Sequence, residues 1–190
     1  MPFWTTYTTD PKRSFRYLFI IPGAGNNLLR TYTIKDVKKP TFQMEAGPQA
    51  KYIQHTFKYP GRVQWQDVTF SVIDPGAQDS EASVALMNIL AESGYEVPTG
   101  DNAAAKRSIS KEKAVGAGIG TPKIQEINAE GRATTTWTLH NTYISSVDFG
   151  NLSYDTDELV TYQVTLVYDY ATINSTLGVE VKDGIRSRSS

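Results

Sequence analysis

Two long stretches in the second half of the chain alternate between large apolar and small polar side chains. In residues 134–147 one face carries Trp137 and Leu139, and the other is almost entirely threonine. In residues 159–170 every second side chain is large and apolar: Val160, Tyr162, Val164, Leu166 and Tyr168. A period of two is typical of a β-strand with one buried face. The two runs predict a long antiparallel hairpin, joined by the turn-rich residues 148–158.

A hairpin of this length exposes unpaired strand edges. Soluble proteins usually blunt such an edge with lysine, proline or a bulge. The run over residues 159–170 contains neither lysine nor proline. Either the rest of the domain or another copy of the protein must therefore cover the edge.

Shorter alternating runs fill much of the remaining chain, and clusters of Gly, Pro, Asn and Asp separate them as turns do. Val68, Phe70 and Val72 share one face of the strongest of these runs. We predict a hairpin within residues 15–37, built from strands 15–21 and 28–37, and further strands over residues 41–45, 52–59, 63–73 and 124–128. The apolar pattern fades after Ala171.

One helix is predicted, over residues 79–93. Asp79 suits its N-cap, and Gly94 stands where a helix terminator belongs. Val84, Met87 and Ala91 fall on one side, with Leu86 and Leu90 close by, and we expect this amphipathic helix to cover an opening of the strand assembly. With roughly eight to ten strands by the spacing rule, the fold class is mainly β, an antiparallel β-sandwich or barrel with one flanking α-helix and a long loop.

The long loop spans residues 98–122 and is rich in glycine, proline and cations. Loops of this length inside a domain tend to be functional or disordered. We expect residues 1–173 to form one domain and residues 174–190 to form a polar C-terminal tail, extended or forming an interface.

Composition narrows the class of function. The formal net charge is −1 and the chain has no cysteine, so bulk attraction to nucleic acid, disulfides and thiolate metal sites are not expected. The N-terminus lacks a signal-peptide layout, and no apolar run reaches the ~20 residues that span a bilayer.

Residues 1–73 hold ten Lys/Arg against four Asp/Glu, whereas residues 74–100 hold five acids and no base. Such blocks fit complementary contact surfaces between copies, or internal neutralisation and solvated loops.

Catalytic and metal chemistry find little support. His55 and His140 could bind a metal with Asp67 or Asp148, but their spacing is not that of a metal site. Nucleophilic catalysis would need a recognisable Ser-His-Asp arrangement, which the two histidines do not offer. Asp155, Asp157 and Glu158 lie in a turn, where solvated acids are far commoner than a glycosidase pair. We expect no enzyme activity and no catalytic, cofactor-binding or metal-ligating residues.

Two motifs in the long loop are candidates for phosphate binding. Gly116, Gly118 and Gly120 have dinucleotide-loop spacing, but Pro122 and a strand follow where that motif needs a helix. The basic residues of the same loop could bind phosphates, or could dock on an acidic neighbour, which we favour because no aromatic platform lies between them. These residues are Lys106, Arg107, Lys111 and Lys113.

Several motifs taken together resemble a known family. No single one is a strict signature, but their order and spacing over residues 10–173 are specific in combination. The motifs are residues 10–17 (DPKRSFRY), 38–42 (KKPTF), 59–62 (YPGR) with Trp65, 73–75 (IDP), 93–96 (SGYE), 137–141 (WTLHN), 146–154 (SVDFGNLSY) and 165–171 (TLVYDYA). In this order the chain resembles the tail tube proteins of contractile-tailed, myovirus-type bacteriophages.

The resemblance implies a small β-barrel or sandwich whose copies form hexameric rings. Rings stack into a tube inside a contractile sheath, with baseplate and tail terminator proteins at its ends, and DNA passes through the lumen without specific binding. No membrane insertion is implied. The expected location is the virion tail, with the host cytoplasm as the place of assembly. The inner tube of a bacterial contractile injection system is the first alternative, and a monomeric β-sandwich binding module is a second.

The residue pattern agrees with that family at two points. A long open edge is satisfied when the next subunit supplies a strand. A wall of Thr, Gln and Asn avoids the attraction for DNA that Lys and Arg create. We therefore expect the threonine face of residues 134–142 or 161–165 to face the lumen, and a deletion of residues 103–113 to impair polymerisation more than folding.

Overall fold

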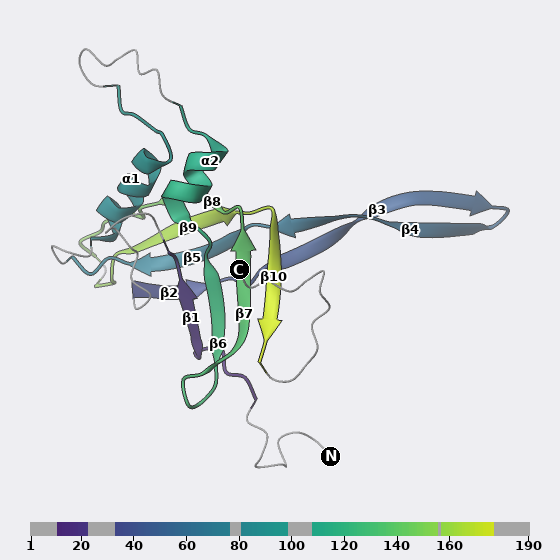
Figure 1. Ribbon diagram of the computed structural model, residues 1–190, viewed down its shortest axis with the longest axis horizontal. Coiled ribbons are helices and arrows are strands. Elements are labelled where there is room, and N and C mark those ends of the chain that lie inside the picture. Colours follow the sequence, from purple (N-terminus) through teal and green to yellow (C-terminus); the bar gives the residue numbers. More distant parts are fainter. Residues whose placement is uncertain (1–10, 23–32, 77–80, 99–107, 156, 177–190) are drawn as a thin grey trace.

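The computed structural model describes residues 11–22, 33–76, 81–98, 108–155 and 157–176. Within these ranges the chain forms ten β-strands, one α-helix of three turns and a short helical segment near residue 115 (Figure 1). All strand pairs are antiparallel. The predicted fold class, mainly β with antiparallel sheets and a flanking helix, is confirmed.

Eight strands form two four-stranded sheets. Sheet A has the order β1 (Tyr17–Ile20), β6 (Lys123–Ile127), β7 (Ala133–His140) and β10 (Tyr170–Ser175). Sheet B has the order β2 (Ile34–Val37), β5 (Val68–Ile73), β9 (Thr161–Val167) and β8 (Tyr143–Asp148). The strands of sheet A run across those of sheet B in Figure 1, as in an orthogonal sandwich.

The remaining strands, β3 (Thr41–Tyr52) and β4 (His55–Gln66), pair only with each other and project away from the sandwich (Figure 1). They lie between β2 and β5 in the chain, so this two-stranded ribbon grows out of sheet B. Residues 41–45 and 52–59 were predicted as two short strands. That prediction was wrong in extent, because Gly47, Pro48 and Pro60 are accommodated in bulges rather than ending the strands.

The core lies between the two sheets and follows the predicted alternation. Val68, Phe70 and Val72 of β5 are all fully buried, as expected from their shared face. In β9 and just after it, four of the five predicted apolar residues are buried, whereas Val160 precedes the strand and is exposed. Each fully buried side chain of this kind stabilises the fold by about 1.5–3 kcal/mol. Sheet A closes the core with Phe19, Ile124 and Leu139, and Phe19 meets Phe70 edge to face at 5.1 Å.

Each of the two long runs in the second half of the chain changes sheets part-way. The first breaks at Asn141, whose φ of 56° is tolerated by asparagine, so β7 belongs to sheet A and β8 to sheet B. The second breaks at Tyr168 and Asp169, between β9 and β10. The predicted hairpin therefore exists only as the β8–β9 pair, because β7 pairs with β6 and β10 instead.

Other predicted pairings also need correction. The strands described within residues 15–37 do not pair as a hairpin, because β1 pairs with β6 and β2 pairs with β5, and residues 23–32 lie outside the described ranges. Residues 63–73 are two strands, divided at Asp67 between the ribbon and sheet B. The strand signal that fades after Ala171 continues as β10 to Ser175, along the edge of sheet A. Alternation identifies a strand but not its partner, and it is weak in short edge strands.

Helix α1 (Ala82–Glu92) lies inside the predicted span of residues 79–93. The proposed N-cap, Asp79, is outside the described residues. The Asp74 carboxylate instead accepts a hydrogen bond from the backbone N–H of Ala82 at 3.4 Å and one from the Tyr162 hydroxyl at 2.7 Å. These two contacts fix the start of α1 to the end of β5 and to β9.

The end of α1 is as predicted, but its buried face is not. Gly94 has a φ of 104° and its N–H bonds to the Ala91 carbonyl, so this glycine ends the helix. The buried residues are Ala82, Leu86 and Ile89, whereas the predicted side is solvent-facing. Ala82 and Leu86 belong to the core, so α1 does cover an opening of the sandwich, with a face rotated from the predicted one.

Part of the predicted long loop is helical. Residues 99–107 lie outside the described ranges, and α2 (Lys111–Lys113) continues into the π-helical η4 (Ala114–Ile119). Ile119 is fully buried, and a side chain at Gly118 would come within 2.9 Å of the Ser93 hydroxyl oxygen. Gly118, one of the glycines that favoured a loop, therefore allows η4 to pack closely against the end of α1.

Candidate assembly surfaces

The ribbon formed by β3 and β4 is the most exposed part of the molecule. Each strand has twelve residues, which spans about 40 Å at ~3.3 Å per residue. Large apolar side chains along it are more than half exposed, among them Phe42, Met44, Tyr52, Phe57 and Tyr59. Soluble proteins seldom leave such a row of apolar groups in water unless it contacts a partner.

Apolar residues pair with each other at both ends of the ribbon. Near the root Phe42 stands opposite Trp65 and Met44 opposite Val63, and near the tip Ala50 stands opposite Phe57. Polar pairs alternate with them, namely Gln43–Gln64 near the root and Gln49–Lys58 and Lys51–Thr56 near the tip. A two-stranded ribbon has no second layer against which its apolar side chains can be buried, so they are covered only when another surface packs on them.

The root of the ribbon is held by aromatic contacts with the sandwich. The ring centroids of Phe42 and Trp65 lie 5.6 Å apart, and those of Trp65 and Tyr168 lie 5.9 Å apart. The Tyr168 hydroxyl donates a hydrogen bond to the Gln66 carbonyl at 2.9 Å, and burial raises the pKa of Tyr168 to about 12. The ribbon therefore leaves the body from a fixed position rather than from a loose joint.

Two compensating bulges interrupt the ribbon near its middle. The register shifts between Met44 and Ala46 and shifts back between Ala46 and Gln49. At this point the two backbones approach so closely that a Cβ on Gly47 would lie 2.4 Å from the Tyr59 carbonyl oxygen. Only glycine fits there without moving the backbone. Each bulge adds one residue to one strand and bends the ribbon, so the alternation of that strand changes phase there while the pairing returns to its earlier register.

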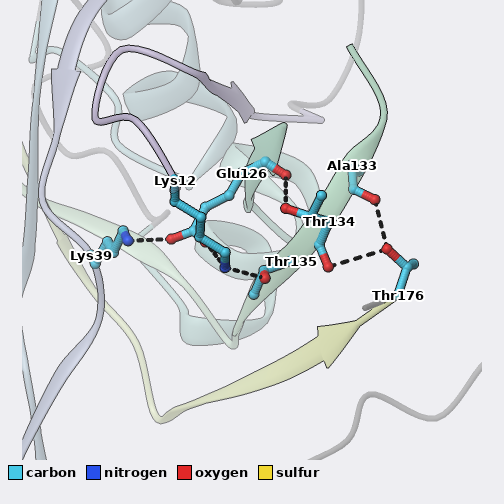
Figure 2. Close-up of polar contacts among 7 residues, drawn as sticks. All are labelled: Lys12, Lys39, Glu126, Ala133, Thr134, Thr135 and Thr176. Atoms are coloured by element: carbon cyan, nitrogen blue, oxygen red, sulfur yellow. Dashed lines mark hydrogen bonds and ion pairs between the residues drawn. The ribbon is translucent and has the colours of Figure 1, made fainter. Parts of the chain in front are cut away.

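A buried carboxylate ties the ribbon root to sheet A. Figure 2 shows Lys12, from the segment before β1, and Lys39, from the segment before β3, converging on Glu126 of β6. Lys12 also donates to the Thr135 hydroxyl at 2.6 Å. Burial acts to raise the pKa of Glu126, but the hydrogen bonds and charges of the two lysines outweigh it and leave the pKa below its ordinary value.

The two sheets end in strands that have a free side. Within the described residues, β2 and β8 are the outer strands of sheet B, and β1 and β10 are those of sheet A. The outward faces carry small polar groups. In sheet A, Gln125, Thr136 and Asn174 stand side by side, and in sheet B, Ser71 lies beside Gln163. Of the two threonine-rich faces expected from the sequence, the one over residues 161–165 is partly or fully exposed, whereas Thr134, Thr138 and Thr142 of the one over residues 134–142 are buried.

The histidines and acids considered for catalysis are dispersed. His55 sits at the exposed end of the ribbon, whereas His140 stacks on Tyr170 at 4.6 Å and bonds to the Thr172 hydroxyl at 2.8 Å. Burial lowers the pKa of His140. Asp155, Asp157 and Glu158 are exposed in the β8–β9 connector. In the described ranges, no three His, Cys, Asp or Glu side chains gather as a metal site would require. Nor is any described helix both long and apolar enough to cross a membrane.

The basic residues of the 98–122 segment have different surroundings. Lys106 and Arg107 lie outside the described ranges. Lys111 binds both carboxylate oxygens of Asp169, at 2.7 and 2.9 Å, beside the corner where the chain changes sheets. Lys111 therefore docks on an acid of its own chain. A deletion of residues 103–113 would remove this ion pair and α2, so it would disturb the folded domain as well.

Two of these surfaces were missed from the sequence, although signals for both are present. Glu126 comes two residues after Ile124, so both side chains lie on the same, buried face of the strand, and a buried acid needs a cation as partner. Residues 41–66 alternate as well, but Gly47, Pro48 and Pro60 hid the length of the two strands. The arrangement offers surfaces for protein contact rather than a reactive centre.

Comparison with known proteins gives matches only among solved structures. No family model matches the chain, and no curated protein matches it significantly. The cryo-electron microscopy structure of the anti-feeding prophage cap, a tube-terminating cap, aligns with a TM-score of 0.60 at 15% identity over 88% of this chain and 93% of that chain. The sheath/tube terminator of PVC, an extracellular contractile injection system, aligns with a TM-score of 0.61 at 15% identity over 88% and 99%.

A third structure, the PVC sheath–tube complex in its extended state, aligns with a TM-score of 0.55 at 14% identity over 87% of this chain and 93% of that chain. The chain has the fold that these cap, terminator and sheath–tube components share. The tail-tube-like fold indicated by the sequence motifs is thereby confirmed, and nothing in these neighbours points to an enzyme.

Proposed function

We propose that this protein is a structural subunit of the tube of a contractile tail, assembling into hexameric rings that stack into a hollow conduit. The observation that carries the proposal is the ribbon, whose large apolar side chains are left exposed by the described residues of the subunit. A contact between the ribbon and a different surface on the next copy does not close on itself, so it adds copies along an axis. Stacked rings need a contact of this kind.

Ring closure needs a second contact, and the sheets supply it. The free side of β8 in one copy can pair with the free side of β2 in the next, which extends sheet B around the ring and removes its edges. We place the lumen wall on sheet B, because its strands β5, β8 and β9 contain no lysine or arginine and its outward residues Thr161, Gln163 and Thr165 are partly or fully exposed. Each sheet carries one lysine, Lys35 in the edge strand β2 of sheet B and Lys123 in β6 of sheet A. A wall with few cations lets DNA pass without being held.

The chain's lack of cysteine allows a direct test of the lumen face. In assembled tubes, a cysteine at Gln163 should react with a small maleimide but not with one carrying a long polymer. A cysteine at Thr136, on sheet A, should react with both. The reverse pattern would assign the lumen to sheet A, and full reactivity at both sites would refute a lumen wall made from either sheet.

The tube can belong to a phage tail that delivers a genome, in which case the particle is a virion assembled in the host cytoplasm. Sheath, baseplate and tail terminator proteins are then its partners. The injection-system alternative is favoured by the solved neighbours, which include a PVC sheath–tube complex. A terminating ring is also compatible with the neighbours, because a cap and a terminator are among them. Neighbouring genes for a portal and terminase, or for a secretion ATPase, would separate phage from injection system.

Electron microscopy of the purified full-length protein tests the assembly itself. Long hollow tubes with six-fold symmetry support a tube subunit, and single rings that do not stack support a terminating role. A protein that remains monomeric by light scattering at high concentration, with and without a nucleating baseplate fraction, would refute assembly. That result would favour the alternative function, a monomeric β-sandwich binding module.

A further inference from the structure

An apolar groove lies beside α1 at the edge of sheet B. It has a volume of about 300 Å³, and the described residues that line it include no charged side chain. Its walls come from α1 with Ser93, from Ile109 and Ala114, and from β8 with the residue after it. The main apolar lining residues are Leu86, Met87, Leu90, Ile144, Val147 and Phe149.

The groove and the ribbon tip lie at opposite ends of the molecule. β4 enters β5 at Val68, and β5 runs the length of sheet B to Ile73, after which the chain leads into α1. Figure 1 accordingly shows α1 at one end of the longest axis and the β3–β4 turn at the other. Copies related by stacking along this axis would bring the tip of one copy to the groove end of the next.

The two ends carry opposite charge. The described residues of 74–98 and 148–160 include eight acids, among them Glu92, Glu96 and Asp148, and no lysine or arginine. Residues 108–119, which also contribute to the groove, add Lys111, Glu112 and Lys113, so the charge of this end stays negative. Residues 46–62 of the ribbon carry Lys51, Lys58 and Arg62 and no acid. Complementary charge favours contact between unlike ends and disfavours contact between like ends, which is the selectivity that a stacked filament requires.

The tip itself presents an unusual apolar residue. Ile53 has a φ of 51° and is 86% exposed. Positive φ is strained for a β-branched residue, and turns usually place glycine or asparagine there. An isoleucine that is strained in the turn and exposed to water gains nothing within its own subunit. Its side chain is therefore best explained by a contact made outside the subunit.

We propose that the ribbon tip of one copy inserts into the groove between α1 and β8 of a second copy, with Ile53 as the anchoring side chain. The basic ribbon then lies against the acidic end of its neighbour. This inference rests on the proposed function and specifies which surfaces meet when rings stack.

Cross-linking tests the inference in the full-length assembled protein. The double variant Ile53→Cys/Met87→Cys should give a ladder of disulfide-linked chains on non-reducing gels after mild oxidation. The matched control is Ile53→Cys/Val84→Cys. Val84 lies on the same helix outside the groove and is 48% exposed, against 47% for Met87. The control should give no ladder.

Tubes that form without a Met87 ladder, or that give an equal ladder through Val84, would refute docking of the ribbon tip in this groove. They would leave the proposed tube function standing. A protein that forms neither rings nor tubes would overturn the proposed function and this inference with it. A Met87 cysteine that a maleimide cannot reach in the free subunit would show that the chain fills its own groove, which also overturns the inference.

A second variant avoids cysteine altogether. Ile53→Asn keeps a residue that tolerates positive φ but removes the apolar anchor. We expect the subunit to fold normally and the concentration needed for assembly to rise at least about tenfold, the scale of one well-packed apolar side chain. Assembly at the wild-type concentration would contradict the proposal.

Discussion

The sandwich and the ribbon use the same pattern of alternating apolar residues with opposite results. In the sandwich, Phe70 of β5 is completely buried against the facing sheet. In the ribbon, Phe57 of β4 stands opposite another apolar residue, Ala50, and is 54% exposed. The difference is one of layers, because the ribbon projects away from the described sheets and helices (Figure 1). Alternation therefore tells which side of a strand is to be covered, but not whether the cover belongs to the same chain.

The largest effect is expected in the sandwich. Phe70→Ala removes a fully buried ring that meets Phe19 and should lower the free energy of unfolding of the subunit by about 3–5 kcal/mol. Chemical denaturation of the isolated subunit measures this. A loss below about 1 kcal/mol would mean that the core between the sheets is not packed as described.

The next effect is expected where the two regions join. Glu126→Gln removes the carboxylate that receives Lys12 and Lys39 and should cost about 1–3 kcal/mol. The matched control Glu45→Gln, on the exposed ribbon, should change stability by less than about 0.5 kcal/mol.

The same variant has a pH signature. The pKa of Glu126 is lowered in the fold, so its contribution is present above the ordinary carboxyl pKa, about 4.3, and is lost as pH falls through the folded value. Unfolding of Glu126→Gln and of the natural protein should therefore converge below about pH 4. A stability difference that is the same at pH 3 and pH 7 would show that the two lysines do not act through the carboxylate charge.

A smaller effect on the subunit is expected from a change within the ribbon. Gly47→Ala places a Cβ against the Tyr59 carbonyl, so the bulged crossing must open. We expect faster amide exchange over residues 41–66 and weaker assembly, with the sandwich unchanged within about 0.5 kcal/mol. Gly116→Ala, where an added Cβ meets nothing within 4 Å, serves as the control and should affect neither.

The smallest effect on folding is expected from Phe57→Ala. The residue is largely exposed, so the free energy of unfolding should change by no more than about 0.5 kcal/mol. Assembly, followed by light scattering, should nevertheless require a higher concentration. If Phe57→Ala destabilised the subunit as much as Phe70→Ala, the contrast between the two regions would be false.

The sequence predicted faces better than partners. The burial of β5 and β9, the end of α1 at Gly94 and the mainly β class follow from alternation and turn chemistry, both of which are local. The corners at Asn141 and Asp169 depend on how two sheets close over one core, so a run that looked like one strand became two. The full length of the ribbon does not follow from the sequence, because Gly47 and Pro60 are typical of turns and here lie in bulges. The buried face of α1 could not be derived, since apolar residues surround that helix.

The route by which the chain enters sheet B has a mechanical consequence. Only Asp67 separates β4 from β5, and β5 is flanked by β2 and β9. A force that pulls on the tip of the ribbon would act along the length of β5. The hydrogen bonds that β5 makes with β2 and with β9 would then be sheared together instead of breaking one after another. Tension along a filament of such subunits would thus be borne by the best-anchored strand of each one.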